Sequence, residues 1–274
     1  MSEMFADLAL SRKLETAEGL AGMAYVEARA RLSPEAGAVW RQIAGATALF
    51  EGLQSPVTQT FGLGLNGIVT AEDLDQLEAF FTERGAPVNH EISPMAHPSI
   101  WPLLTARGYT PIEFTSLLYR DLASDPPAPS RVRGIEIRRA EEDPGTWARV
   151  STEGWSETAE FGDILPEMMR MMLATSGFKP FLAWSEGEPI AAAALNVRGP
   201  VAFLAGAATI PRARGRGAQR ALLEERLRAA LAEGCEIAAM GALAGSTSQR
   251  NAERAGFRIA YTRTKWRLET RRSL

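Results

Sequence analysis

The feature that most limits how this chain can fold is an order of helices and strands that occurs twice. In each half the spacing of apolar residues predicts helix, strand, helix and strand. The glycines that end the corresponding helices repeat too: Gly85 and Gly234 are 149 positions apart, and Gly108 and Gly256 are 148 apart. Agreement in order, type and spacing favours an internal duplication, with a chance similarity of alternating helix and strand as the alternative. The predicted segments are 70–85, 87–92, 97–109 and 113–122 in the first half, and 217–234, 235–243, 246–257 and 260–268 in the second.

A proline-rich stretch, "DLASDPPAPSRVRG" (residues 121–134), separates the two halves. Its three prolines disfavour both a helix and a central strand. We therefore expect a first domain over 1–124, a linker over 125–133 and a second domain over 134–274. Residues 180–210 predict a three-strand meander with turns at Glu186-Gly187 and Arg198-Gly199. The fold class that follows is α/β (α+β), with a mixed, mostly antiparallel sheet flanked by helices in each domain.

Composition removes several classes of function. A net charge of −3 argues against broad nucleic-acid binding, and 46% hydrophobic residues give ample material for a core. The only cysteine, Cys235, excludes an internal disulfide, and with His90 and His97 as the only histidines we expect no metal site. No apolar run is long enough to span a membrane, so the expectation is a cytoplasmic protein.

A basic, glycine-rich loop is the strongest local signal, in "PRARGRGAQRALLEERL" (residues 211–227). Gly215 and Gly217 allow positive φ and a close approach of the backbone to a ligand. The helix that follows presents unpaired N–H groups to the same point, and Arg212, Arg214 and Arg216 add positive charge. The pattern favours an anion site. From these residues alone the anion could be a nucleotide or a nucleic acid, and the loop could also be a solvated turn.

The surroundings of the loop narrow the choice. The loop "TIPRARGRGAQRALL" follows the strand meander, and "NAERAGF" comes about thirty residues later. Over roughly residues 134–268 this arrangement resembles the GCN5-related N-acetyltransferase family, and residues 35–121 look like a degenerate copy. The resemblance implies two tandem acetyltransferase-like domains. It also implies transfer of an acetyl group from acetyl-CoA to a primary amine.

The resemblance assigns the cosubstrate site residue by residue. In that family an R-x-x-G-x-G/A loop binds the pyrophosphate of acetyl-CoA, and Gln219 departs from it where Gly or Ala is usual. Because Gln219 can still offer its backbone N–H, we expect binding to survive. The preceding strand, from Ala208 to Ile210, is expected from the resemblance to pair with the pantetheine arm and polarise the thioester carbonyl. The loop positions implied are Arg214, Gly215, Arg216, Gly217, Ala218 and Gln219.

The catalytic residues are less well marked. Family members often carry a tyrosine acid four residues before the glycine of the "GF" element, and here that position is Ala252. Asn251 or Ser246 could donate a hydrogen bond instead. For a general base the stretch "EGWSETAEFGD" (residues 153–163) offers Glu160 among three glutamates, and solvated surface is the alternative interpretation for each.

Two other functions are compatible with the sequence. A non-catalytic acyl-CoA-binding or regulatory protein would keep the loop and lack the chemistry, as Ala252 favours. A nucleic-acid binder would use the arginines, but the acidic balance speaks against it. The first domain is not expected to bind CoA, because Thr70 and Asp73 predict a capping box at the matching helix end. Neither the acceptor nor the oligomeric state can be predicted from the sequence.

Overall fold

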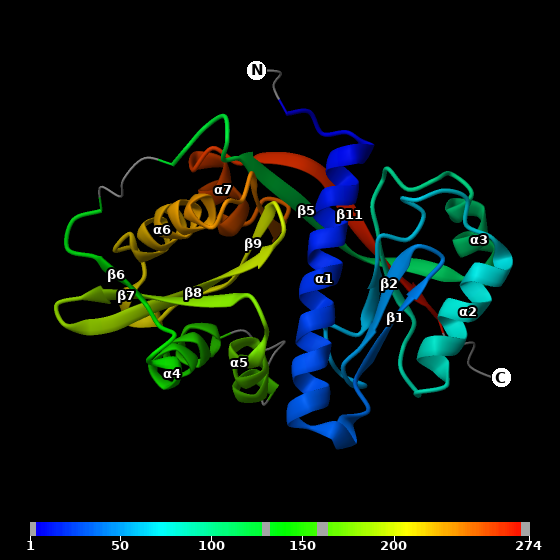
Figure 1. The fold of residues 1–274 in the computed structure, drawn as a ribbon, viewed down its shortest axis with the longest axis horizontal. Helices are drawn as coiled ribbons and strands as arrows, with labels where there is room; N and C mark the ends of the chain where they lie inside the picture. Colours follow the sequence, from blue (N-terminus) through cyan, green and yellow to red (C-terminus); the bar gives the residue numbers. More distant parts are fainter. Residues whose placement is uncertain (1–3, 128–131, 158–163, 270–274) are drawn as a thin grey trace. The chain divides into compact units, whose positions relative to one another are not determined.

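The computed structural model describes residues 4–127, 132–157 and 164–269 (Figure 1). The fold is mixed α/β, with mostly antiparallel strands flanked by helices, as the sequence predicts. Contacts within the chain divide it into two compact units. We call residues 2–118, 241–250 and 259–274 the first unit, and residues 119–240 and 251–258 the second unit.

In the first unit the strands lie in the order β1-β2-β3-β4-β11-β5. β1, β2 and β3 form an antiparallel meander, β3 pairs with β4 in parallel, and β4 pairs with β11 antiparallel. The helix α1 packs on the meander. The bounds are α1 Leu8–Leu32, η1 Pro34–Ala36, β1 Val39–Ile43, β2 Ala46–Phe50, β3 Gln59–Phe61, α2 Ala71–Thr82, β4 Asn89–Ile92, α3 Ile100–Arg107, β5 Tyr109–Asp121 and β11 Arg258–Leu268.

Local capping explains where two of these helices begin. The Asp7 carboxylate accepts a hydrogen bond from the Leu10 amide at 2.9 Å, which satisfies one of the free N–H groups at the start of α1. The predicted capping box of α2 is confirmed. The Thr70 hydroxyl accepts from the Asp73 amide at 3.2 Å, and the Asp73 carboxylate accepts from the Thr70 amide at 2.8 Å. The first turn of α2 therefore carries its own negative charge.

In the second unit the strands lie in the order β10-β9-β8-β7-β6. β9 and β10 are parallel, and the remaining pairs are antiparallel. Figure 1 shows α6 on one side of these strands and α4 and α5 on the other. The bounds are β6 Glu136–Arg139, α4 Pro144–Trp155, α5 Leu165–Ala174, β7 Phe178–Ser185, β8 Glu188–Arg198, β9 Val201–Thr209, η3 Pro211–Ala213, α6 Ala218–Ala232, β10 Ile237–Leu243 and α7 Thr247–Arg254. Residues 241–243 of β10 and 247–250 of α7 group with the first unit.

The repeated order of elements is present in the structure as α2-β4-α3-β5 and α6-β10-α7-β11. The meander turns also form where expected, with positive φ at Gly187 and Gly199. The two units do not follow a single cut in the sequence, however. Residues 259–274 group with the first unit, because β11 pairs with β4 there. The division at 125–133 stays a prediction, and it does not describe where the last strand packs.

Candidate functional site

The loop between β9 and α6 has the geometry of an anion site. Gly215 and Gly217 have φ of 77° and 85°, a left-handed conformation that glycine adopts without strain. Gly217 is the residue that precedes α6, and among the residues that the structure describes no side-chain hydrogen bond caps the start of this helix. Those N–H groups and the positive end of the helix dipole therefore face outward at the loop. Ala218 is buried and anchors the helix start against the protein.

Carboxylates pair with all three loop arginines. Arg212 donates to Glu153 of α4, and Arg214 donates to Glu157 at 2.5 Å. Arg216 lies 3.3 Å from the carboxylate of Glu186. The guanidinium groups are about half exposed, and ion pairs of this kind contribute at most about 1 kcal/mol each. An incoming pyrophosphate could therefore displace these carboxylates at little cost.

The edge of β9 beside the loop is open toward β10. The two parallel strands, both described throughout, pair from Val201 to Phe203 and then separate, whereas β9 continues to Thr209. The Ile210 amide donates to the Ile190 carbonyl at 3.1 Å, on the β8 side. Hydrogen-bonded and non-bonded pairs alternate in an antiparallel ladder, so the polar groups of Ala208 also face β8. The backbone of Thr209 faces the open edge.

This register changes the interpretation of two predicted residues. Ala208 and Ile210 were expected to meet the pantetheine arm through their backbones. Their side chains are buried and their amides belong to the β8 ladder, so both serve to hold the strand. Thr209, between them, is the residue that can pair with an extended ligand along the edge.

β9 contains a β-bulge close to its end. Gly206 and Ala207 lie opposite the single residue Ala193 of β8, and Gly206 has φ of 60°. The Trp147 indole of α4 donates to the Ala193 carbonyl at 3.0 Å. Arg226, from α6, donates to the neighbouring Ala194 carbonyl at 3.0 Å. Side chains from both helix layers thus satisfy the carbonyl groups around the bulge.

Arg226 is unusual because it is buried without a carboxylate partner among the described residues. Its guanidinium also reaches the Ala205 carbonyl of β9 at 3.4 Å and the Leu222 carbonyl of its own helix at 3.2 Å. Burial lowers the pKa of Arg226 to about 9. The sequence alone did not reveal this residue, because an arginine on an amphipathic helix is normally expected at the surface.

Gln219 joins the end of β9 to the start of α6. Its side-chain amide donates to the Thr209 hydroxyl at 2.9 Å. The Gln219 backbone N–H is in the first turn of the helix and has no side-chain cap. The departure from the family's Gly or Ala at this position therefore leaves the amide in place.

The predicted catalytic residues are placed less favourably. The Ser246 hydroxyl accepts from the Gln249 amide at 3.2 Å and so caps α7. Asn251 lies exposed on α7, and Ala252 beside it is fully buried. Glu160 lies outside the described residues. Its role stays a prediction.

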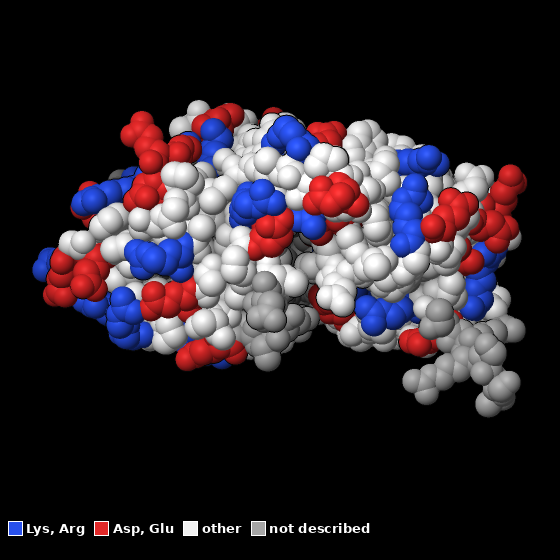
Figure 2. Space-filling model, turned by 90° about the horizontal axis from the view of Figure 1, so that it is seen from below, with Lys and Arg blue, Asp and Glu red and all other residues white. Residues whose placement is uncertain are grey.

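Charge on the surface is mixed. Figure 2 shows one face of the protein on which Lys and Arg side chains are interspersed with Asp and Glu. This pattern lacks the continuous basic stripe expected on that face of a nucleic-acid binder. Across the described part of the chain, no helix is long and apolar enough to cross a membrane. The same residues contain no group of three His, Cys, Asp or Glu side chains placed to hold a metal ion.

Comparison with known proteins gives a family match for part of the chain. Residues 142–257 match the model of the acetyltransferase (GNAT) family, and this segment contains β9, the loop, α6 and α7. The match covers less than half of the chain. No curated protein sequence matches the chain.

Solved structures with the same fold match most of the chain. A GCN5-related N-acetyltransferase from Kribbella flavida is 16% identical, with a TM-score of 0.64 over 90% of this chain and 96% of that one. One from Sphaerobacter thermophilus is 17% identical, with a TM-score of 0.56 over 92% and 91%. A tandem GNAT protein from the clavulanic acid biosynthesis pathway is 14% identical, with a TM-score of 0.52 over 73% and 69%. At these identities the likeness establishes the fold.

Proposed function

We propose that this chain is an acyl-CoA-dependent N-acetyltransferase that transfers the acetyl group of acetyl-CoA to a primary amine. The observation that carries the proposal is the loop at Gly215 and Gly217, placed at the uncapped start of α6 and beside the open edge of β9. It lies inside the segment that matches the acetyltransferase family. An anion site next to an unpaired strand edge suits a pyrophosphate followed by an extended pantetheine arm.

The cosubstrate would be held mainly by backbone groups. The first-turn amides of α6, Gln219 among them, would donate to the pyrophosphate, and Arg214 and Arg216 would add charge-assisted hydrogen bonds. The amide groups of the pantetheine arm would pair with β9 at Thr209. The thioester carbonyl would then lie close to backbone donors of the bulge, where negative charge develops on its oxygen during attack by the amine. Trp147 and Arg226 support this position by fixing the bulge.

Binding at the loop would also change the state of nearby acids. Arg212 and Arg214 pair with Glu153 and Glu157. A pyrophosphate that takes over these arginines would release the two carboxylates near the end of α4. A released glutamate could accept the proton of the attacking amine. Glu160 belongs to the same stretch and stays a candidate for this role.

Protonation of the leaving thiolate has no assigned acid. Ala252 fills the position where the family's tyrosine is common, and Asn251 or Ser246 would offer only a weak donor. A solvent water would then complete the step. This feature favours the second candidate function, an acyl-CoA-binding or regulatory protein without catalysis.

The tandem arrangement is part of the proposal. The two runs of helix, strand, helix and strand support an origin by duplication, with residues 1–124 as a degenerate copy, 125–133 as a linker and 134–274 as the CoA-binding domain. The capping box at Thr70 and Asp73 supports loss of CoA binding by the first copy, since its carboxylate occupies the helix start that a pyrophosphate would need.

A CoA titration by calorimetry tests the site. Gly217→Glu would place a side chain and a carboxylate at the anion position, and we expect the affinity for CoA to fall at least tenfold, about 1.4 kcal/mol. Gly199→Glu is the control for a glutamate at a glycine with positive φ, because Gly199 lies in the turn between β8 and β9; a Cβ there meets nothing within 4 Å, whereas a Cβ at Gly217 would lie 3.0 Å from the Val132 Cγ1. Equal affinity in both variants would refute the site. Acetylation of a panel of primary amines then separates the enzyme from the non-catalytic alternative.

A further inference from the structure

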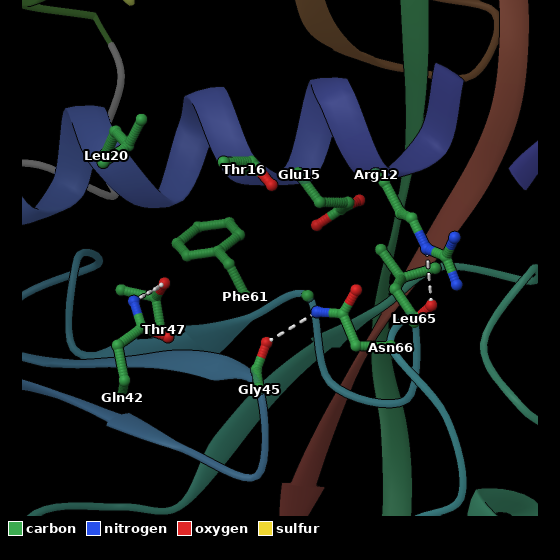
Figure 3. A pocket seen from close by; sticks show the side chains of 11 residues that line it. Arg12, Glu15, Thr16, Leu20, Gln42, Gly45, Thr47, Phe61, Leu65 and Asn66 are labelled. Carbon is green, nitrogen blue, oxygen red and sulfur yellow. Dashed lines mark hydrogen bonds between the residues drawn. The ribbon is translucent and has the colours of Figure 1, made fainter. Parts of the chain in front are cut away.

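The first unit contains a cavity that the proposed acetyl transfer does not use. It has a volume of about 210 Å³ and lies between α1 and the β1–β3 meander (Figure 3). One water occupies roughly 30 Å³ in the liquid, so the cavity has room for a molecule of about seven to ten non-hydrogen atoms. All its lining residues belong to the first unit.

One face of α1 supplies the charged side of the cavity. Glu15 and Thr16 follow Arg12 by three and four positions, which places them on the same side of the helix as Arg12. Figure 3 shows these side chains extending from α1 toward Phe61 and Leu65 on the opposite wall. A cation, a carboxyl group and a hydroxyl group therefore border one small space.

Glu15 is the buried polar group of this cavity, with only 1% of its side chain exposed. Its carboxylate accepts from the Tyr261 hydroxyl at 2.9 Å and lies 3.4 Å from the Arg263 guanidinium. Arg263 is shared, because it also pairs with Glu18 at 2.6 Å and with Glu91 at 2.9 Å. One guanidinium thus forms ion pairs with three carboxylates.

The wider network of ion pairs also contains fewer cations than carboxylates. Lys265 pairs with Glu91 at 3.2 Å and with Glu113 at 3.0 Å, so two cations serve four carboxylates. Burial, together with Glu18 and Glu91, raises the pKa of Glu15 to about 7, although Arg263 acts in the opposite direction. A further cation beside Glu15 would balance the network and take the place of a proton.

The other walls fit a short molecule that has an anionic group and an apolar group. Arg12 donates through Nε to the Leu65 carbonyl at 2.8 Å, and within the described residues no carboxylate pairs with it. Its remaining N–H groups can meet an anion. Leu20 and Phe61 form an apolar wall on another side (Figure 3). The cavity thus offers a carboxylate, a guanidinium and an apolar surface within the span of a small molecule.

We propose that the first unit binds a small free α-amino acid with a short apolar side chain, its ammonium group at Glu15 and its carboxylate at Arg12. The ammonium group completes the charge balance of the buried carboxylates. The carboxylate forms a charge-assisted pair at the rim. The side chain lies against Phe61 and Leu20. This site is separate from the CoA loop and does not depend on the acetyltransferase proposal.

Calorimetry with L-valine on the full-length protein tests the proposal, with the other L-amino acids as a panel. Two analogues test the two polar contacts separately: isobutylamine lacks the carboxylate and isovalerate lacks the ammonium group. We expect valine to bind at least tenfold more tightly than either analogue. Near pH 7 binding should release protons, which is measured by repeating the titration in phosphate and in Tris. Equal binding of valine and isovalerate, or no binding of any amino acid, would overturn the proposal.

Two variants locate the site. Glu15→Gln should lower the affinity for valine at least tenfold and abolish the proton release, whereas Glu27→Gln, an exposed position on the same helix, should leave both unchanged. Arg12→Met should weaken valine but not isobutylamine. Valine binding that both cavity variants leave intact would place the ligand elsewhere and overturn the proposal. If Glu15→Gln does not fold, Arg12→Met, whose side chain is exposed, decides the question with the two analogues.

Discussion

A methyl group added at Gly154 tests whether the close packing of α4 on β9 shapes the cosubstrate site. A Cβ atom at this position would lie 2.6 Å from the Ala208 Cβ and 3.1 Å from the Thr209 amide nitrogen. Non-bonded carbon atoms normally lie about 3.5–4.0 Å apart, so the overlap is about 1 Å. β9 cannot yield easily, because Ala208 is held in the ladder with β8. The end of α4 must therefore move outward.

The size of the effect follows from two opposing contributions. Overpacking of this kind costs about 1–3 kcal/mol, and alanine gains up to about 1 kcal/mol over glycine within a helix. We expect Gly154→Ala to lower the free energy of unfolding by about 1–2 kcal/mol, and Tm by about 2–8 °C for a chain of this size. The displacement also carries Glu153 away from Arg212, which removes a carboxylate that competes with the cosubstrate for this arginine, so the KM for acetyl-CoA should fall modestly rather than rise.

The same helix provides the control. Gly145 lies near the start of α4, and a Cβ there would meet nothing within 4 Å. Gly145→Ala should therefore keep the wild-type stability or gain up to about 1 kcal/mol. Thermal and urea unfolding of both variants are compared by fluorescence and circular dichroism, whose coincidence checks for a single transition. If Gly154→Ala is as stable as Gly145→Ala, the close contact between α4 and β9 does not exist as described.

Three further predictions concern the site and its support. Calorimetry should give one CoA per chain, because the Thr70–Asp73 capping box closes the matching helix in the first unit; a stoichiometry of two would refute this. With Ala252 in place of a tyrosine acid, kcat should rise with pH until the acceptor amine is neutral and show no falling limb near pH 10; such a limb would reveal another acid. Burial lowers the pKa of Arg226 to about 9 in the folded protein, well below its value in the unfolded chain, so the folded state binds fewer protons above pH 9. Above pH 9 the wild type should gain up to about 1.4 kcal/mol per pH unit in unfolding free energy relative to Arg226→Met, and a constant difference in urea unfolding at pH 8 and 10 would contradict the assignment.

The parts of the fold that the sequence predicts well are those with local signals. The positive φ of Gly215 and Gly217, the start of α6 and the capping box of α2 depend on neighbours a few positions apart, and each forms as expected. The turns of the meander at Gly187 and Gly199 depend on glycine conformation and are confirmed as well.

The features that the sequence did not reveal depend on distant partners. No pattern predicts that Arg226 enters the core, because its acceptors are carbonyls exposed by a bulge in two other strands. Glu15 lies on a long helix among other charged residues, and its partners in the buried network, Tyr261 and Arg263, are 246 and 248 positions away. The direction of the Ala208 and Ile210 backbone amides could not be predicted for the same reason, because it depends on the register of β9 with β8.

The place of β11 has a consequence for how the protein is made. Residues 259–268 are synthesised long after β4 and α1, yet they pair with β4 and supply Arg263 to Glu15. The first unit therefore cannot reach its final structure before β11 has been synthesised, although domains generally fold in order from the N-terminus. Until then the edge of β4 and the carboxylates of α1 lack their partner. A nascent chain arrested before residue 259 should expose this edge to chaperones, and a separately expressed fragment of residues 1–124 should aggregate unless a peptide covering β11 is supplied.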